Sequence, residues 1–263
     1  NDFEQKRQET QNIVEQLHSI TSKNYFHSLF SDSTFILSLA TTLQHAVDLG
    51  MPQLALTLAD PVFQILKAVG FSQPNTLIAR NNLAYAYQTV GRLDEAITLR
   101  QQNLKVLTDI LGPDAPDTSH LRNNLASAYQ AAGRLDEAIK LRQQNLKDSE
   151  DLLGPDHPRS LTIRNNLACT YQAAGRLDKA IRLLKQVLEE STRILGPHHP
   201  DTLQARNNLA TTYHHAGQLD EAVKLHEQVL EESTRILGIN HPDTLTSRNN
   251  LAGAYRDAGR LDE

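Results

Sequence analysis

The chain has 263 residues and a formal net charge of -5 at pH 7. Lysine and arginine are interleaved with aspartate and glutamate, which argues against nucleic acid as a partner, because phosphate binding needs clustered cations. No stretch approaches the ~18 consecutive apolar residues of a membrane helix, so we expect no membrane partner. Cys169 is the only cysteine, which excludes an intrachain disulfide and predicts a cytoplasmic protein.

The N-terminal region predicts three helices. Residues 1–33 are expected to form an N-terminal capping helix over 1–22 and a polar linker, although 1–22 are also compatible with the end of a coiled coil. Residues 34–70 predict two further helices, a degenerate helical repeat in which Gly50 closes the first helix. Pro61 should kink or break the second helix, because proline removes a backbone donor.

The sequence Arg-Asn-Asn-Leu-Ala then recurs with a period of 42 residues, which is the signature of a repeat architecture. The copies begin at Arg80, Arg122, Arg164, Arg206 and Arg248. They divide the chain into five repeats over about 71–112, 113–154, 155–196, 197–238 and 239–263, the last truncated. Because the chain begins with Asn1 and stops inside a repeat, we interpret it as a fragment of a longer protein.

Each repeat predicts two helices, here called A and B. Helix A begins at a proline, which suits the first helical position because its missing N–H has no partner there. The prolines are Pro74, Pro116, Pro158, Pro200 and Pro242. Helix A ends at a glycine, and helix B begins at Leu-Asp-Glu, whose acidic side chains oppose the positive end of the helix dipole. Helix B ends at the glycine of a Leu-Gly pair.

The residues Leu83, Ala84, Tyr87, Gly91 and Ala96 have the spacing of the tetratricopeptide repeat (TPR), and later repeats preserve it. The 42-residue form resembles the kinesin light chain repeats and their bacterial look-alikes. The near-identity of successive repeats is more similar to the bacterial relatives. This resemblance implies an all-α, right-handed solenoid of helix pairs, whose A helices line a concave peptide-binding groove.

Turned away from the buried face of helix A is a second stripe, at spacings of four, three and four residues. The resemblance implies that this stripe lines the groove. Its recurring member is the second Asn of each pair: Asn82, Asn124, Asn166, Asn208 and Asn250. Variable members that we expect to supply selectivity are Tyr85, Ser127, Cys169, Thr211, His120, Gln204 and His215.

Two interpretations of the second Asn stay open. Its amide offers donors and an acceptor, so a row of such amides could hold the backbone of an extended peptide, as the resemblance implies. Alternatively, the amides hold adjacent helices together, and this structural role is the one favoured for the first Asn of each pair. The preceding Arg is expected to pair with an acid of the adjacent repeat or, alternatively, to form a cationic edge.

The remaining chemistry points away from catalysis. His157, His199 and His241 recur at the starts of the A helices, and residues one repeat apart cannot share a metal ion that needs ligands at ~2 Å. We therefore expect no metal and no cofactor. Cys169 is a lone thiol without an evident activating base, so we expect no enzyme.

We therefore predict a non-enzymatic scaffold that binds a peptide or protein segment in the groove. Two alternatives belong to other classes. The chain could be the sensor or regulatory arm of a larger signalling NTPase or effector. It could also be a self-assembly module, forming a homo-oligomer through uncapped repeat ends or the N-terminal helix.

Overall fold

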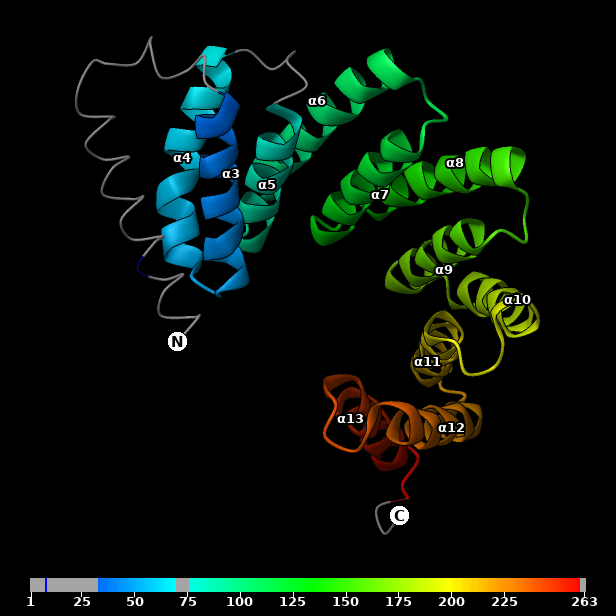
Figure 1. Cartoon of the computed structure of the whole chain (residues 1–263). Coiled ribbons are helices and arrows are strands. Elements are labelled where there is room, and N and C mark those ends of the chain that lie inside the picture. Colours follow the sequence, from blue (N-terminus) through cyan, green and yellow to red (C-terminus); the bar gives the residue numbers. More distant parts are fainter. Residues whose placement is uncertain (1–7, 9–32, 70–75, 261–263) are drawn as a thin grey trace. The chain divides into compact units, whose positions relative to one another are not determined.

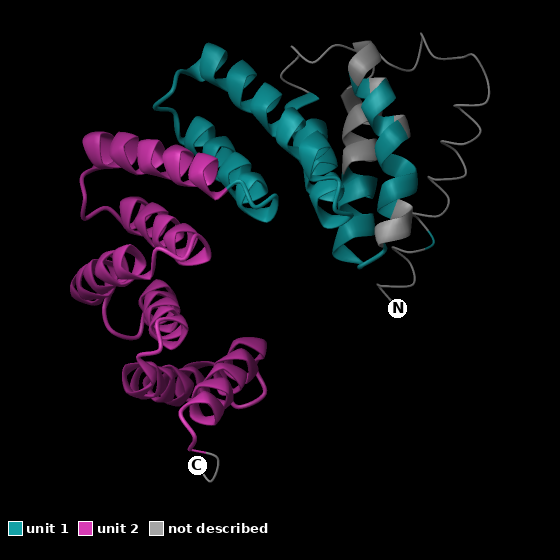
Figure 2. Ribbon diagram, turned by 180° about the vertical axis from the view of Figure 1, so that it is seen from behind, with its two compact units in different colours: residues 1–134 teal, residues 135–263 magenta. Residues whose placement is uncertain are grey.

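The structure, a computed structural model, describes residue 8 and residues 33–69 and 76–260 (Figure 1). Within these ranges all regular secondary structure is α-helical, which confirms the predicted fold class. The capping helix and linker predicted over residues 1–33 lie almost wholly outside the described residues. The described chain forms two compact units, 1–134 and 135–263, which Figure 2 shows in different colours.

Unit 1 holds two helices of the degenerate repeat and the first regular helices. Its elements are α3 (Ser33–Asp48), α4 (Pro52–Val69), α5 (Thr76–Thr89), α6 (Leu93–Leu111) and α7 (Pro116–Ala131). The first three pack against one another, α6 packs on α5, and α7 packs on α6. Their shared core includes Leu43, Leu58, Leu83 and Tyr87, all with almost no exposed surface.

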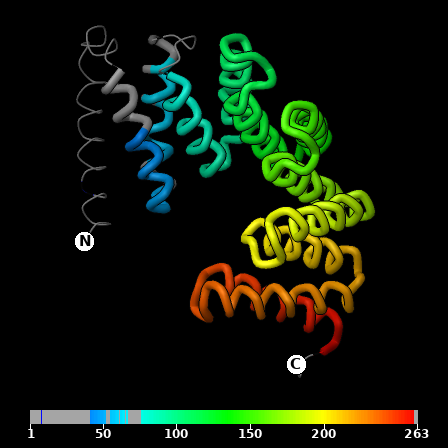
Figure 3. Tube along the Cα trace, turned by 45° about the vertical axis from the view of Figure 1, so that its right-hand side comes forward, coloured from blue at the N-terminus to red at the C-terminus, as the bar shows by residue number. Residues whose placement is uncertain are grey.

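Unit 2 continues the alternation of A and B helices (Figure 3). Its elements are α8 (Leu135–Leu153), α9 (Pro158–Ala173), α10 (Leu177–Leu195), α11 (Pro200–His215), α12 (Leu219–Leu237) and α13 (Pro242–Asp257). Each helix packs against the next one in sequence, and the A helix α11 also contacts the A helices α9 and α13. Successive A helices therefore form one continuous row.

Pro61 was expected to kink or break its helix, and the predicted break does not occur. Helix α4 runs without interruption from Pro52 to Val69. Leu58, Ala59, Val62 and Leu66, on either side of the proline, are buried in the core of unit 1. Burial of this apolar face stabilises the helix by more than the one backbone hydrogen bond that proline removes.

Helix starts follow the sequence signals. Helices α7, α9, α11 and α13 begin at the predicted prolines, whereas Pro74 lies outside the described residues. At α9, the side chain of the N-cap residue His157 accepts a hydrogen bond from the backbone N–H of Arg159 at 3.1 Å. His199 and His241 cap α11 and α13 in the same way. The recurring histidines therefore satisfy backbone donors that a helix start leaves unpaired.

The helices of type A end slightly before the glycine at which the sequence predicts their end. In α7 the last helical residue is Ala131, and Gly133 then adopts a positive φ of 71°. This conformation lets the backbone N–H of Arg134 reach back to the carbonyl of Tyr129 at 2.8 Å. Glycine enters this conformation without the steric cost that a Cβ atom imposes, so the turn into helix B depends on it.

One buried position of helix B changes chemistry from repeat to repeat. It is occupied by Arg100, Arg142, Leu184 and His226 in turn. Arg142 donates to the backbone carbonyl of Asn166 at 2.6 Å and to the Thr170 hydroxyl of the next A helix. His226 is 1% exposed, and its Nδ1 has no hydrogen-bond partner among the described residues. Burial, with a smaller effect from His214, lowers the pKa of His226 to about 4.

The shifted pKa of His226 predicts a pH-dependent stability. Between pH 6.5 and about 4 the unfolded chain binds a proton that the folded chain does not, so stability falls as the pH falls through this window. The full loss is about 3 kcal/mol. The substitution His226→Leu, which copies fully buried Leu184 one repeat earlier, should remove this component. Urea unfolding at pH 7 and pH 4.5 measures it, and an unchanged pH dependence would contradict the assignment.

Candidate functional site

In each of the two units, the predicted stripe of the A helices faces solvent. Every member of it is exposed or half-buried, whereas Leu83, Ala86 and Tyr87 on the opposite face of α5 are buried. The predicted site residues on this surface are Asn82 and Tyr85 of α5; His120, Asn124 and Ser127 of α7; Asn166 and Cys169 of α9; Gln204, Asn208, Thr211 and His215 of α11; and Asn250 of α13. The period of helix A thus separates core from surface as the sequence predicts.

The paired asparagines connect neighbouring A helices. Asn208 Nδ2 donates to Asn165 Oδ1 at 3.0 Å, and Asn250 Nδ2 donates to Asn207 Oδ1 at 3.2 Å. In the last two repeats the second Asn therefore bonds to the first Asn of the repeat before it, as the structural alternative predicts for these positions. Each amide also has a second N–H and further acceptor capacity. These two pairs are called the amide ladder below.

A second set of polar contacts joins the C-terminal ends of the same helices. Gln172 Nε2 lies 2.8 Å from Nδ1 of His215, a predicted site residue, and Gln172 Oε1 accepts from the Thr212 hydroxyl at 3.2 Å. One repeat later, His214 Nε2 lies 2.8 Å from Asp257 Oδ2. Adjacent A helices of unit 2 are therefore held in register at both the middle and the end of the stripe.

The recurring arginines do not form the cationic edge that one interpretation predicted. Arg80, Arg122, Arg164 and Arg206 are buried, and only Arg248 is exposed. Arg164 pairs with Glu150 of the adjacent repeat at 2.5 Å and also with Glu190 of its own repeat. Pairing with an adjacent acid is thus confirmed for Arg164, because a buried guanidinium requires compensating acceptors.

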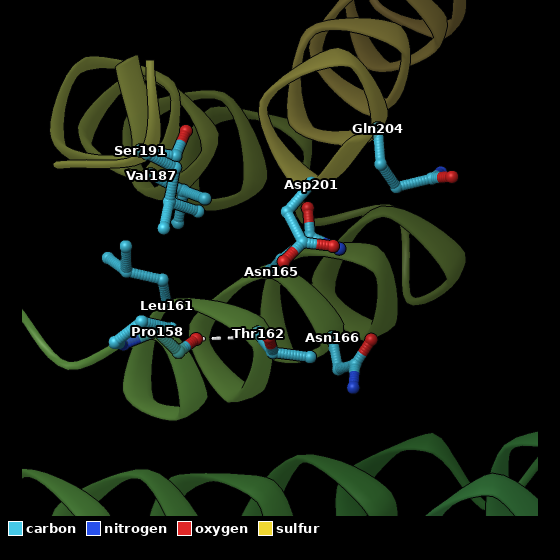
Figure 4. A pocket seen from close by; sticks show the side chains of 10 residues that line it. Pro158, Leu161, Thr162, Asn165, Asn166, Val187, Ser191, Asp201 and Gln204 are labelled. Carbon is cyan, nitrogen blue, oxygen red and sulfur yellow. Dashed lines mark hydrogen bonds between the residues drawn. The ribbon is translucent and has the colours of Figure 1, made fainter. Parts of the chain in front are cut away.

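Unit 2 contains two equivalent recesses beside the stripe, one in each of two successive repeats. The smaller, of about 150 Å³, lies between α9, the end of α10 and the start of α11. Figure 4 shows Leu161, Val187 and Ser191 facing one another across it, with Asp201 beside Asn165. The predicted site residues Asn166 and Gln204 also line this smaller recess. The stripe therefore borders a concave feature of the surface.

The larger recess, of about 470 Å³, lies between α11, α12 and α13. Its lining repeats that of the smaller one 42 residues later, with Leu203, Val229, Ser233 and Asp243 in place of the residues seen in Figure 4. Position 204, a glutamine beside the smaller recess, is matched by the shorter Thr246 beside the larger one.

An ion cluster lies at one side of the larger recess. Glu232 accepts from Arg206 at 3.0 Å and contacts His198 Nδ1 at 2.9 Å. Burial acts to raise the pKa of the Glu232 carboxyl, but the hydrogen bonds from His198 and Arg206 outweigh it and lower that pKa. His198 itself lines the recess. This carboxylate is therefore compensated from within the chain.

Sequence reasoning missed most of the recess lining. Asp201, Asp243 and Ser233 were not singled out, because each recurs with the 42-residue period of the fold and so carries no signal of its own. The signal that could have found them is the apolar Ile-Leu pair at the end of helix B. In the fourth repeat these residues, Ile236 and Leu237, are 44% and 41% exposed despite lying beside the core.

Other chemistry at the stripe is limited. Burial raises the pKa of the half-buried Cys169 thiol, and nearby Arg142 lowers it by less. This shift keeps the thiol protonated at neutral pH and makes it a poor nucleophile. Among the described residues, no three His, Cys, Asp or Glu side chains are grouped closely enough to hold a metal ion. Nor is any helix in that part of the chain long and apolar enough to cross a membrane.

Comparison with solved structures identifies similar repeat arrays. Two crystal structures contain the nearly identical TPR-like repeats of a candidate kinesin light chain from Podosopora anserina. One is 31% identical with a TM-score of 0.66, covering 78% of this chain and 97% of its own length. The other is 29% identical with a TM-score of 0.67, covering 77% of this chain and 96% of its own length.

More distant structures share the fold alone. BtubC (BKLC) from P. vanneervenii is 23% identical with a TM-score of 0.61, covering 86% of this chain and 84% of that one. No match was found among curated protein sequences. The profile of the tetratricopeptide repeat family matches residues 75–138, 120–189, 171–231 and 201–263, which together span more than half of the chain. This chain therefore belongs to the tetratricopeptide repeat family, whose repeats generally serve as protein-interaction scaffolds.

Proposed function

We propose that this chain is a non-enzymatic scaffold that binds an extended peptide or protein segment along the stripe of its A helices. The observation that supports this most directly is the coincidence of three features on one surface of unit 2. The amide ladder, the exposed variable residues and the two recesses all border α9, α11 and α13. Repeat arrays present such extended surfaces to their partners.

The amides of the ladder and the variable residues would make different contacts with a peptide. Asn208 and Asn250 each donate one N–H to the neighbouring repeat, whereas Asn165 and Asn207 each accept that bond through the side-chain oxygen. Gln204 also donates to Asn208 Oδ1, and the remaining donors and acceptors of these amides are offered to a peptide backbone. Backbone contacts of this kind do not depend on the peptide's sequence. Selectivity then comes from the recesses and from variable residues such as Thr211 and His215. A single cysteine, which cannot form an intrachain disulfide, agrees with a cytoplasmic setting for this activity.

The two alternatives remain hypotheses that rest on the sequence. A signal transduction ATPase with a TPR sensor, PH0952 from Pyrococcus horikoshii, covers 95% of this chain and 40% of its own length, with a TM-score of 0.60 and 14% identity. At that identity the likeness concerns the fold and supplies no argument for a sensor role.

The hydrogen bonds of the amide ladder should contribute to the stability of the chain. We expect Asn165→Ala and Asn208→Ala to be coupled by about 1 kcal/mol in a double-mutant cycle, because each removes the partner of the other. The free energy of unfolding in urea measures this coupling. The matched control is the cycle of Asn165→Ala with Asn250→Ala, which share no bond and should be additive. Equal coupling in both cycles would contradict the ladder.

The stripe of the A helices should contact the partner directly. A photo-crosslinking amino acid at Thr162 or Thr246, exposed stripe positions whose hydroxyls bond only to their own helix, should capture a partner segment from the source cell's lysate. The same amino acid at Lys224 or Glu189, exposed on B helices, should not. The captured segment, made synthetically, should then bind the purified chain in calorimetry. Equal capture from the B helices, or no direct binding, would contradict a stripe-centred scaffold.

A further inference from the structure

The two recesses of unit 2 are versions of one site with different capacities. In both, an A helix, the end of its own B helix and the start of the next A helix supply the walls. The volumes are about 150 Å³ and about 470 Å³. Gln204 lines both recesses. At the edge formed by the following A helix, Gln204 of the smaller recess is matched by the shorter Thr246 of the larger one, and at the edge formed by the first A helix, Thr162 is matched by Gln204.

The larger recess has a mainly apolar floor. Leu203 and Val229 are buried, and Ile236 and Leu237 expose roughly two fifths of their surface at its side. Ser233, which is 4% exposed, also lines this recess. Exposed apolar surface next to a cavity of this size is favourable for burying a bulky apolar side chain.

A carboxylate stands at each recess. Asp243 lines the larger one with 77% of its side chain exposed, and Asp201 lines the smaller one with 60% exposed. Each lies 3.7–3.8 Å from the N-cap histidine two residues earlier, His241 or His199. Neither carboxylate pairs with a lysine or arginine within the described part of the chain. Glu232, by contrast, is already compensated by Arg206.

We propose that the larger recess receives a bulky apolar side chain of a partner peptide, and that Asp243 pairs with a lysine or arginine next to that side chain. The smaller recess receives a smaller apolar side chain of the same peptide, with Asp201 as the second acidic contact. This proposal rests on the scaffold function proposed above and specifies its ligand as an apolar–basic segment. Charge complementarity selects this occupant, because the only uncompensated charges lining the two recesses are carboxylates.

The spacing of the recesses restricts the peptide further. Neighbouring packed helices lie about 8–10 Å apart, and an extended chain advances about 3.3 Å per residue. The two apolar side chains should therefore be about three residues apart. The ladder bond between Asn208 and Asn165 crosses between the same A helices as the smaller recess, so the peptide backbone would pass over the ladder amides.

The proposal is tested with fluorescently labelled 12-residue peptides and the full 263-residue chain. One set has a Trp and a Leu three residues apart, each beside a Lys, in both orders. A second set replaces Lys with Glu, and a third replaces Trp and Leu with Ser. Fluorescence anisotropy should show at least roughly 10-fold tighter binding of the first set than of the third, from burial of the apolar side chains, and a weakening with added salt.

Two variants of the larger recess and one control variant test whether its size and the charge of Asp243 determine peptide binding. Thr246→Gln gives the larger recess the residue of the smaller one and should weaken the Trp-containing peptides about 10-fold. Asp243→Asn keeps the shape but removes the charge, and should weaken them roughly 3-fold and flatten the salt dependence. Asp220→Asn removes an exposed acid at the start of α12, outside either recess, and should change neither quantity.

The outcomes separate this inference from the scaffold function. Preference for the acidic set, or binding that Thr246→Gln leaves unchanged, overturns the apolar–basic ligand while the scaffold stands. Binding of none of the three sets also overturns it, and the crosslinking at Thr162 and Thr246 then decides independently whether the stripe binds any protein. Selective binding of the first set, weakened in both recess variants by these factors and unchanged in Asp220→Asn, supports it.

Discussion

Close packing between small side chains is the constraint on which each repeat depends. In the first regular repeat Ala84 of helix A and Ala96 of helix B share one core cluster and have no exposed surface. Within unit 2, Ala168 with Ala180 and Ala210 with Ala222 are equally buried. Because interiors are packed as densely as organic crystals, a larger residue at such a position would force helices apart and cost about 1–3 kcal/mol.

With the alanine positions held constant, neighbouring contacts can change their chemistry without changing the fold. The repeating tyrosine shows this clearly. Tyr129 and Tyr171 accept hydrogen bonds from Gln101 and Gln143 of the preceding B helix, at 2.7 and 2.9 Å. At the same position in later repeats, Lys185 lies over the ring of Tyr213, and Glu227 accepts from the Tyr255 hydroxyl. The tyrosine ring fills the same space in each case, while the partner of its polar end varies.

The candidate site arises from the same combination of constancy and variation. Two asparagine pairs tie α9 to α11 and α11 to α13, which fixes the positions of these A helices relative to one another. The recesses repeat as well, but two matched lining positions differ: Thr162 and Gln204 of the smaller recess correspond to Gln204 and Thr246 of the larger one. A preorganised polar row beside cavities of different sizes is suited to holding a backbone and selecting side chains, since rigid sites lose less entropy on binding.

The sequence by itself determined the repeat, the helix starts and the two faces of helix A. These features depend on local signals: the 42-residue period, proline at the first helical position, and apolar residues at helical spacing. Even so, local reasoning failed at Pro61, where packing of Leu58, Val62 and their neighbours keeps α4 continuous.

Only the tertiary structure decided the partners and the spaces between repeats. Packing of the helices brings Asn208 to Asn165 and Arg164 to Glu150. It also leaves Nδ1 of His226 without a partner among the described residues, and it makes one recess larger than the equivalent recess in the neighbouring repeat. The physical reason is that propensity and periodicity act within one helix. A hydrogen bond between repeats or a cavity depends instead on where side chains from several helices meet once those helices have packed.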